Sequence, residues 1–254
     1  MMKIGFFDSG MGGLTVLKKA IEQFPQQDYV YYADSDYAPY GLKSREEVLG
    51  CCHRVVQFLL QKEVELIVIA CNTATSIAIE ELRNCYQIPI IGIEPAIKPA
   101  LTRVRNEDER ILVTATPLTL KERKIEVLLK KFDKNNQCDL LPLPQLVRWA
   151  EQKEFSKELV AHYLKEELRG LPVSAYRQVV LGCTHFPLFK SAFKEALGDS
   201  IQFVDGGDGV VKRMATFIPE QDKRVRKIGD YKFYRNQETL SMEDILVFFN
   251  QLND

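Results

Sequence analysis

Short apolar runs alternate with amphipathic stretches along most of this 254-residue chain. The clearest run is Leu66 to Ile69, four consecutive aliphatic residues. It is too short and too uniformly apolar for an amphipathic helix, so it predicts a strand buried on both faces. Comparable runs predict further strands at residues 3–7, 29–32, 88–93, 110–116, 138–141, 179–181 and 201–205. Helical patterns between these runs predict an α/β fold with parallel sheets.

The order of predicted elements begins again near Arg110, where residues 110–116 read as a new first strand. Each half then contains one unit in which a strand is followed by a cysteine and a helix start. We therefore predict two pseudo-symmetric α/β lobes, each with a parallel sheet, and an active site in the cleft between them. Near the C-terminus, the charged alternation of residues 228–236 predicts an exposed edge strand.

The two cysteines of these units are the strongest candidates for chemistry. Cys71 follows the strand at 66–69 and precedes Asn72 and Thr73, which suit a helix N-terminus. Unpaired N–H groups and the helix dipole favour an anion there, which predicts a pKa below the free thiol value of about 8.5 and a thiolate at Cys71. Cys183 follows the strand at 179–181, with a helix expected to start near Pro187. Either cysteine alone would suit a core position, but the repeated context favours two opposed thiols.

Polar residues at the ends of other predicted strands are further candidates. Asp8 and Ser9 follow the first strand, where a carboxylate can meet an ammonium group and a hydroxyl can meet a carboxylate. Asp8 also suits a helix N-cap, and it would repel a phosphate in a turn that lacks the nucleotide-binding glycine patterns. Tyr40 and Gly41 lie in the loop after the second strand and offer a hydroxyl and a backbone N–H.

Composition narrows the class of partner. A net charge of −1 gives no global field toward nucleic acid or an acidic membrane, and neither partner is expected. No signal-peptide pattern or long apolar span is found, so a cytoplasmic location is expected. The six cysteines match neither a secreted disulfide framework nor a zinc motif, and Cys51, Cys52 and His53 lie in a helical pattern that indicates a structural role. Reduced cysteines and no metal are therefore predicted.

Four motifs occur in the order and spacing of glutamate racemases, which belong to the aspartate/glutamate racemase family. These motifs are Asp8-Ser9-Gly10, Pro39-Tyr40-Gly41, Cys71-Asn72-Thr73 and Gly182-Cys183-Thr184-His185. The chain resembles this cofactor-independent family from Lys3 to about Asp205, and more weakly to its C-terminus. The resemblance implies a discontinuous N-terminal lobe of residues 1–96 and 206–254, a second lobe of residues 97–205, and D-glutamate production for cell-wall peptidoglycan.

The resemblance also implies roles for individual residues. Cys71 would deprotonate D-glutamate and Cys183 would deprotonate L-glutamate, with Asp8 and His185 adjusting proton transfer at their respective thiols. Glu151 is a candidate supporting residue, although its segment aligns only loosely with the family's acidic site. The implied substrate-binding residues are Asp8, Ser9, Pro39, Tyr40, Gly41, Asn72, Thr73, Thr116, Thr119, Thr184 and His185.

Two cysteines suit a racemase, because inversion at an α-carbon needs one acid/base group on each face. Aspartate racemase shares this logic, and His185, where that relative usually has an acidic residue, favours glutamate. An amino-acid-binding protein without catalysis is the alternative of another class, and two positioned cysteines speak against it. No cofactor is implied, although a Schiff-base lysine for pyridoxal phosphate leaves no motif to find. A homodimer is compatible with the resemblance.

Overall fold

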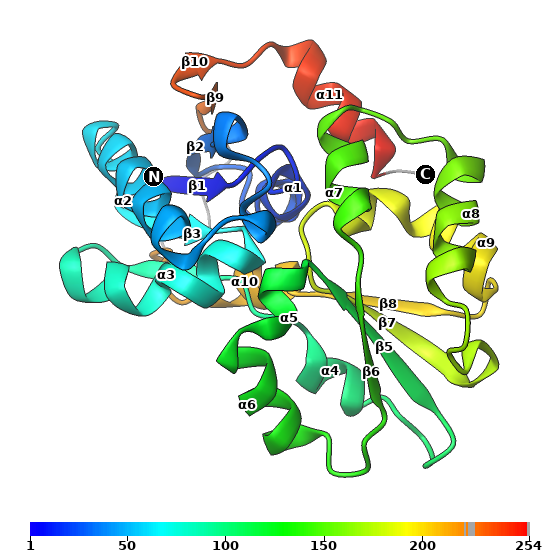
Figure 1. Ribbon diagram of the computed structural model, residues 1–254. Helices are drawn as coiled ribbons and strands as arrows, with labels where there is room; N and C mark the ends of the chain where they lie inside the picture. The colour runs from blue at the N-terminus through cyan, green and yellow to red at the C-terminus, as the bar shows by residue number, and fades with distance from the viewer. Residues whose placement is uncertain (221, 223–226, 253–254) are drawn as a thin grey trace.

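The computed structural model describes residues 1–220, 222 and 227–252, and within them the strands form two sheets (Figure 1). The first sheet has the order β10-β9-β2-β1-β3-β4 and the second has the order β6-β5-β7-β8. The first contains β1 (Lys3–Asp8), β2 (Asp28–Ala33), β3 (Leu66–Ile69), β4 (Ile90–Gly92), β9 (Tyr231–Arg235) and β10 (Glu238–Thr239). The second contains β5 (Arg110–Ala115), β6 (Cys138–Pro142), β7 (Tyr176–Leu181) and β8 (Gln202–Asp205).

The two sheets share one topology. The order β2-β1-β3-β4 of the first sheet corresponds to β6-β5-β7-β8 of the second, and all these neighbours pair in parallel. The α/β fold and the relation between the halves, both predicted from the apolar runs, are confirmed. Because the strands are parallel, their carboxyl ends lie along one edge of each sheet, where open α/β sheets bind ligands.

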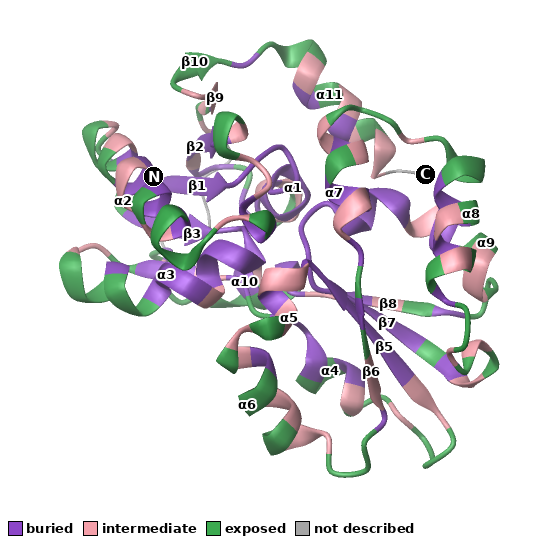
Figure 2. Ribbon diagram, viewed as in Figure 1, coloured by how far each residue is buried: buried purple, intermediate pink, exposed green. Residues whose placement is uncertain are grey.

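Helices cover both faces of each sheet, which explains why the central strands β1, β3, β5 and β7 are buried along almost their whole length (Figure 2). In β1, Phe6 belongs to one buried cluster and its neighbour Phe7 to another on the opposite face. The helices are α1 (Leu14–Gln23), α2 (Arg45–Gln61), α3 (Asn72–Cys85), α4 (Ile97–Leu101), α5 (Pro117–Lys121), α6 (Arg123–Phe132), α7 (Pro144–Glu151), α8 (Lys157–Glu167), α9 (Lys190–Leu197), α10 (Gly207–Met214) and α11 (Met242–Gln251). In the described part of the chain, no helix has the length and apolar character needed to cross a bilayer.

Two predicted helices differ from the structure. The helix expected at 118–132 is divided into α5 and α6, because Glu122 between them has an extended backbone. This break lets α5 pack against the 3₁₀ turn Tyr40–Leu42 while α6 packs on α4. The helix expected near Pro187 starts as a 3₁₀ turn, Phe186–Phe189, and becomes α-helical at Lys190.

The C-terminal segment returns to the first sheet. The strand predicted at 228–236 is confirmed as β9, but its predicted edge position is wrong, because β9 pairs in parallel with β2 and antiparallel with β10. The two-residue β10 forms that edge instead, and Phe233 of β9 is buried. α11 packs on α1 and also contacts the second half, through a 5.8 Å ring contact between Phe248 and Phe155. The C-terminal helix therefore joins both halves, and the boundaries at 96/97 and 205/206 stay a prediction.

Candidate active site

The predicted catalytic residues lie at the carboxyl ends of equivalent strands in the two sheets. Asp8 ends β1 and Cys71 follows β3 after one residue, while Cys183 follows β7, the counterpart of β3. Cys71 is 5% exposed and Cys183 is 7% exposed, so the two thiols are buried where the halves meet. They are close enough for negative charge on Cys183 to raise the pKa of Cys71.

Cys71 occupies the N-cap position of α3, as the sequence predicts. Its Sγ accepts the backbone N–H of Ala74 at 3.4 Å and lies 3.7 Å from Ser9 Oγ. Burial and the nearby charge of Asp8 nevertheless raise the pKa of this thiol, and the Ala74 N–H opposes them only in part. The predicted lowering of the Cys71 pKa is therefore wrong for this buried arrangement, because desolvation of the thiolate exceeds the helix-terminus effect.

Asp8 connects the two halves of the molecule. Its Oδ2 accepts the backbone N–H of Gly13 at 2.6 Å and the hydroxyl of Thr184 at 2.9 Å. Its Oδ1 is buried and has no hydrogen-bond partner in the protein. Burial raises the pKa of Asp8, while His185 and the Thr184 hydroxyl act against that rise. An open acceptor therefore remains beside Cys71.

Cys183, His185 and Glu151 form a line of contacts at the other thiol. The Sγ of Cys183 lies 3.6 Å from His185 Nδ1, and His185 Nε2 lies 2.6 Å from Glu151 Oε1. Burial opposes a charged imidazole, yet the contacts with Cys183 and Glu151 raise the pKa of His185 well above its usual value. Burial likewise opposes ionised Glu151, whose pKa is lowered by His185 and by the N–H of Met11. These partners favour imidazolium next to Cys183.

Glycines in the loop after β1 allow this close approach between the halves. A Cβ on Gly10 would lie 2.2 Å from Glu151 Oε1, and a Cβ on Gly12 would lie 2.6 Å from His185 Nδ1. The hydroxyl of the buried Tyr31 donates to the Gly10 carbonyl at 2.6 Å and holds the loop in place. Sequence reasoning missed Tyr31, since a tyrosine in a strand pattern carries no signal for a polar contact with a distant loop.

Three predicted threonines meet across the boundary between the halves. Thr73 Oγ1 lies 3.1 Å from Thr116 Oγ1 and 2.9 Å from Thr119 Oγ1, and the latter two lie 2.9 Å apart. Gly41 packs against this group, because a Cβ there would lie 2.5 Å from the Thr116 Cβ. The loop at Pro39, whose bond with Ala38 is cis, therefore reaches the second half of the chain.

The hydroxyl of Tyr40 is hydrogen-bonded to a neighbouring carboxylate. It donates to Asp34 Oδ2 at 2.6 Å, and Arg54 binds both oxygens of the same carboxylate at 3.0 and 2.8 Å. The Tyr40 hydroxyl proton is thus used by Asp34, and the role of Tyr40 in substrate binding stays a prediction. Sequence reasoning missed Asp34 and Arg54, because their contact joins the end of β2 to α2 with no motif between them.

Two of the buried polar atoms without a partner belong to residues of the candidate site. Among the described residues, four buried side-chain atoms have no hydrogen-bond partner in the protein: Asp8 Oδ1, Gln27 Nε2, Asn72 Nδ2 and Gln178 Oε1. Asn72 is the first residue of α3 and directly follows Cys71. One open acceptor thus belongs to Asp8, whose charge acts on Cys71, and one open donor belongs to Asn72, the next residue in the chain. A buried polar atom without a hydrogen bond destabilises the folded state unless a ligand or water supplies a partner. The open acceptor and the open donor therefore indicate a binding site for a molecule with a positive and a negative group.

Comparison with known proteins gives a consistent picture. Residues 10–214 match the family of Asp/Glu/hydantoin racemases. The chain is 42% identical over 251 residues to glutamate racemase 2 of Bacillus subtilis strain 168, covering 99% of this chain and 95% of that protein.

Solved structures agree on the fold. The crystal structure of glutamate racemase from Campylobacter jejuni subsp. jejuni has a TM-score of 0.83 at 27% identity, with 99% of this chain and 98% of that chain covered. The glutamate racemase of Francisella tularensis subsp. tularensis, solved in complex with D-glutamate, has a TM-score of 0.79 at 27% identity and covers 100% and 94% of the two chains. With the family matched from the loop after β1 to the end of α10, this chain belongs to the Asp/Glu/hydantoin racemase family.

Proposed function

We propose that this protein is a glutamate racemase that interconverts L- and D-glutamate without a cofactor. The observation that carries the proposal is the placement of Cys71 and Cys183 after equivalent strands of two related sheets, each beside its own ionisable partner. The full-length similarity to a glutamate racemase of B. subtilis supports glutamate as the substrate.

The proposed reaction uses one thiol on each face of the α-carbon. For L-glutamate, Cys183 as thiolate removes the α-proton, and Cys71 as thiol donates a proton to the opposite face. For D-glutamate the roles are reversed. The raised pKa of Cys71 supports a thiol in this position before L-glutamate reacts. General acid and base groups work best when their pKa values lie near the working pH, so substrate binding must lower the raised pKa of Cys71.

The neighbours of each thiol would support proton transfer. The positive charge favoured on His185 stabilises a thiolate at Cys183, and Glu151 keeps the imidazole oriented through its 2.6 Å contact. On the other side, Asp8 disfavours the thiolate of Cys71 and so favours its protonated form. This asymmetry sets up one base and one acid for the L to D direction.

The open polar atoms suit an amino acid. Asp8 Oδ1 accepts hydrogen bonds and can bind the substrate ammonium group, while Asn72 Nδ2 donates and can bind a carboxylate. Ser9, Thr73 and Thr184 add hydroxyls around this space, with Thr116, Thr119 and the Pro39-Tyr40-Gly41 loop on its far side.

Substrate entry would require the two halves to separate. The cysteines are buried, and hydrogen bonds such as Thr184 to Asp8 and Thr73 to Thr116 cross between the halves. We assign residues 1–96 and 206–254 to one lobe, of which 221, 223–226 and 253–254 lie outside the described residues, and 97–205 to the other. The return of β9 and β10 to the first sheet supports this division.

In the cell, the proposed role is the supply of D-glutamate for peptidoglycan in the cytoplasm. The decisive experiment incubates the purified protein with L-glutamate, after dialysis against EDTA and without pyridoxal phosphate, and measures D-glutamate by chiral chromatography. We expect D-glutamate to accumulate to the racemic mixture, with much slower turnover of L-aspartate. Faster turnover of aspartate would replace the proposed substrate, and inactivity with both would overturn the proposal.

A further inference from the structure

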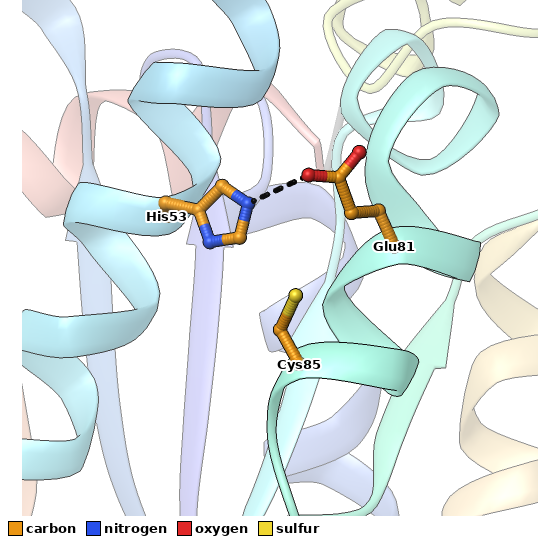
Figure 3. Close-up of side chains that lie close together, drawn as sticks. All are labelled: His53, Glu81 and Cys85. Carbon is orange, nitrogen blue, oxygen red and sulfur yellow. Dashed lines mark hydrogen bonds and ion pairs between the residues drawn. The ribbon is translucent and has the colours of Figure 1, made fainter.

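A second group of reactive side chains lies on the outer surface, between α2 and α3 (Figure 3). It consists of His53 from α2 with Glu81 and Cys85 from α3, and one ligand atom from each lies within 4.8 Å of the others. Among the described residues, no other group of three His, Cys, Asp or Glu side chains has its ligand atoms close enough to share one ion. Cys71 starts α3 and Cys85 ends it, so the helix separates the two thiols by roughly 20 Å.

The three side chains combine the donor types that zinc accepts. Imidazole nitrogen, thiolate sulfur and carboxylate oxygen all bind Zn²⁺ in proteins, at about 2.0–2.3 Å. His53 Nε2 lies 3.3 Å from Glu81 Oε1. In a tetrahedral site with bonds of about 2.0–2.1 Å, two such ligands are separated by roughly 3.3–3.4 Å. Two of the three ligands are therefore already spaced for a shared ion.

The ring of His53 has a polar neighbour at each of its two nitrogens. Its Nδ1 lies 3.0 Å from the hydroxyl of Tyr86, and the two rings are 5.7 Å apart between centroids. In the tautomer whose Nδ1–H donates to the Tyr86 hydroxyl, Nε2 keeps a lone pair directed at Glu81; in the other tautomer Nε2–H donates to Glu81, and a cation must displace that proton. Metal-binding histidines usually have such a partner on the second nitrogen. An unprotonated Nε2 facing a carboxylate places two acceptors together, which a cation between them would stabilise.

The exposure of these side chains also suits ion exchange with solvent. His53 is partly buried, whereas Glu81 and Cys85 are exposed on the next helix. Glu81 and Cys85 are four residues apart and so share one face of α3. The Sγ of Cys85 lies within 4.8 Å of the other two ligand atoms, and its exposure gives water access to a bound ion.

We propose that His53, Glu81 and Cys85 bind a divalent transition-metal ion, with Zn²⁺ preferred because thiolate and imidazole are both among its ligands. The ion would link α2 to the end of α3, the helix that carries Cys71 and Asn72 at its start. Because a ligand that binds only the folded state stabilises it, zinc raises the melting temperature. The site was not foreseen from the sequence, where His53 is distant from the other two and no cysteine motif is present.

The test uses the full chain, stripped of metal with EDTA and kept reduced. Co²⁺ is added in steps, since a bond between Co²⁺ and a thiolate gives a charge-transfer absorption band, and Zn²⁺ is then added to displace it. We expect a band that saturates at one equivalent of Co²⁺ and disappears with Zn²⁺. Cys85→Ser should abolish the band, while Cys138→Ser, which removes a thiol elsewhere, should leave it unchanged.

A second pair of variants separates ligand loss from unfolding. Tyr86→Phe keeps every proposed ligand and should weaken binding by about 10-fold or more, through loss of the partner on Nδ1. His53→Ala should remove the rise in melting temperature that zinc causes, with circular dichroism used to verify the fold. A band that persists in Cys85→Ser, or that is lost in Cys71→Ala instead, would locate the ion at other thiols and overturn the proposal.

Discussion

The hydroxyl of Tyr40 donates a 2.6 Å hydrogen bond to the carboxylate of Asp34, and both side chains are buried. Arg54 neutralises this carboxylate from α2 and stacks its guanidinium 4.0 Å from the ring centroid of Tyr37. The backbone N–H of Asp34 in turn donates to the carbonyl of Asp8 at 3.1 Å. The loop that packs on Thr116 is therefore anchored to the same strand ends that carry the candidate catalytic residues.

This anchor predicts the effect of Tyr40→Phe. The variant leaves a charged, buried acceptor without one partner, so we expect a loss of about 1.5–3 kcal/mol in the free energy of unfolding. We also expect KM for glutamate to rise as the loop loosens. Urea unfolding and steady-state racemisation measure the two effects.

Asp34→Ala separates this view from direct substrate contact. If the hydroxyl acts only through Asp34, both variants lower stability and raise KM in the same way. If the hydroxyl binds substrate, Asp34→Ala spares KM and contradicts the anchoring role. Tyr231→Phe is the control, because the Tyr231 hydroxyl donates to the Pro25 carbonyl at the surface. This variant should change neither the free energy of unfolding nor KM appreciably.

The glycines of the loop after β1 give a second prediction. Gly12→Ala would place a methyl group 2.6 Å from His185 Nδ1, so the two halves must shift apart. Such overpacking costs about 1–3 kcal/mol in the free energy of unfolding, and racemisation should fall because His185 is displaced.

Gly50→Ala is the matched control for this substitution. Gly50 lies in α2, and its new methyl group would meet nothing within 4 Å. This variant should gain about 0.5–1 kcal/mol of stability and keep full activity. Thermal unfolding of both proteins tests the pair, and equal effects at the two glycines would contradict the close-contact explanation.

Most of the fold followed from local sequence signals. The run at Leu66 to Ile69 and its relatives predicted the parallel strands, because a doubly covered sheet requires apolar residues on both faces. What the sequence did not reveal depends on pairing at long range. The place of β9 inside the sheet depends on the partner strand β10, and the division of α5 from α6 depends on packing against the other half.

In the candidate site, too, local sequence signals predicted some features, whereas others depend on packing between distant elements. Strand ends and the helix start placed Cys71, Asp8 and Cys183 together, as expected from parallel topology. The sign of the pKa shift at Cys71 could not be predicted, since it depends on how completely other elements exclude water. The partner of Tyr40 was equally hidden, because Asp34 and Arg54 meet only once α2 packs on the sheet.

Removal of either thiol should abolish racemisation. Cys71→Ala and Cys183→Ala each delete the only proposed base on one face, so activity should fall by at least about 10²-fold. Cys138→Ser removes a thiol in β6 and should keep normal activity. Residual activity above roughly a hundredth of the parent in either alanine variant would contradict the two-base assignment.

The raised pKa of Cys71 predicts slow alkylation at neutral pH. Burial and Asp8 both disfavour the reactive thiolate, so modification by iodoacetamide should accelerate as pH rises. Asp8→Asn removes the negative neighbour and lowers the thiol pKa, which should increase alkylation of Cys71 at pH 7 while racemisation falls. Mass spectrometry of the peptide that contains Cys71 follows the rate, and slower alkylation in the variant would reverse the assigned influence of Asp8.

The final prediction concerns which face each thiol serves. A glutamate analogue with a good leaving group at the β-carbon needs only one deprotonation to eliminate, and no proton from the opposite face. Cys71→Ser should therefore still eliminate from the L analogue through Cys183, and Cys183→Ser from the D analogue through Cys71. Release of the leaving group from each enantiomer measures this preference. An equal response of both variants to both enantiomers would contradict the assignment, whereas reversed preferences would keep two bases and exchange their faces.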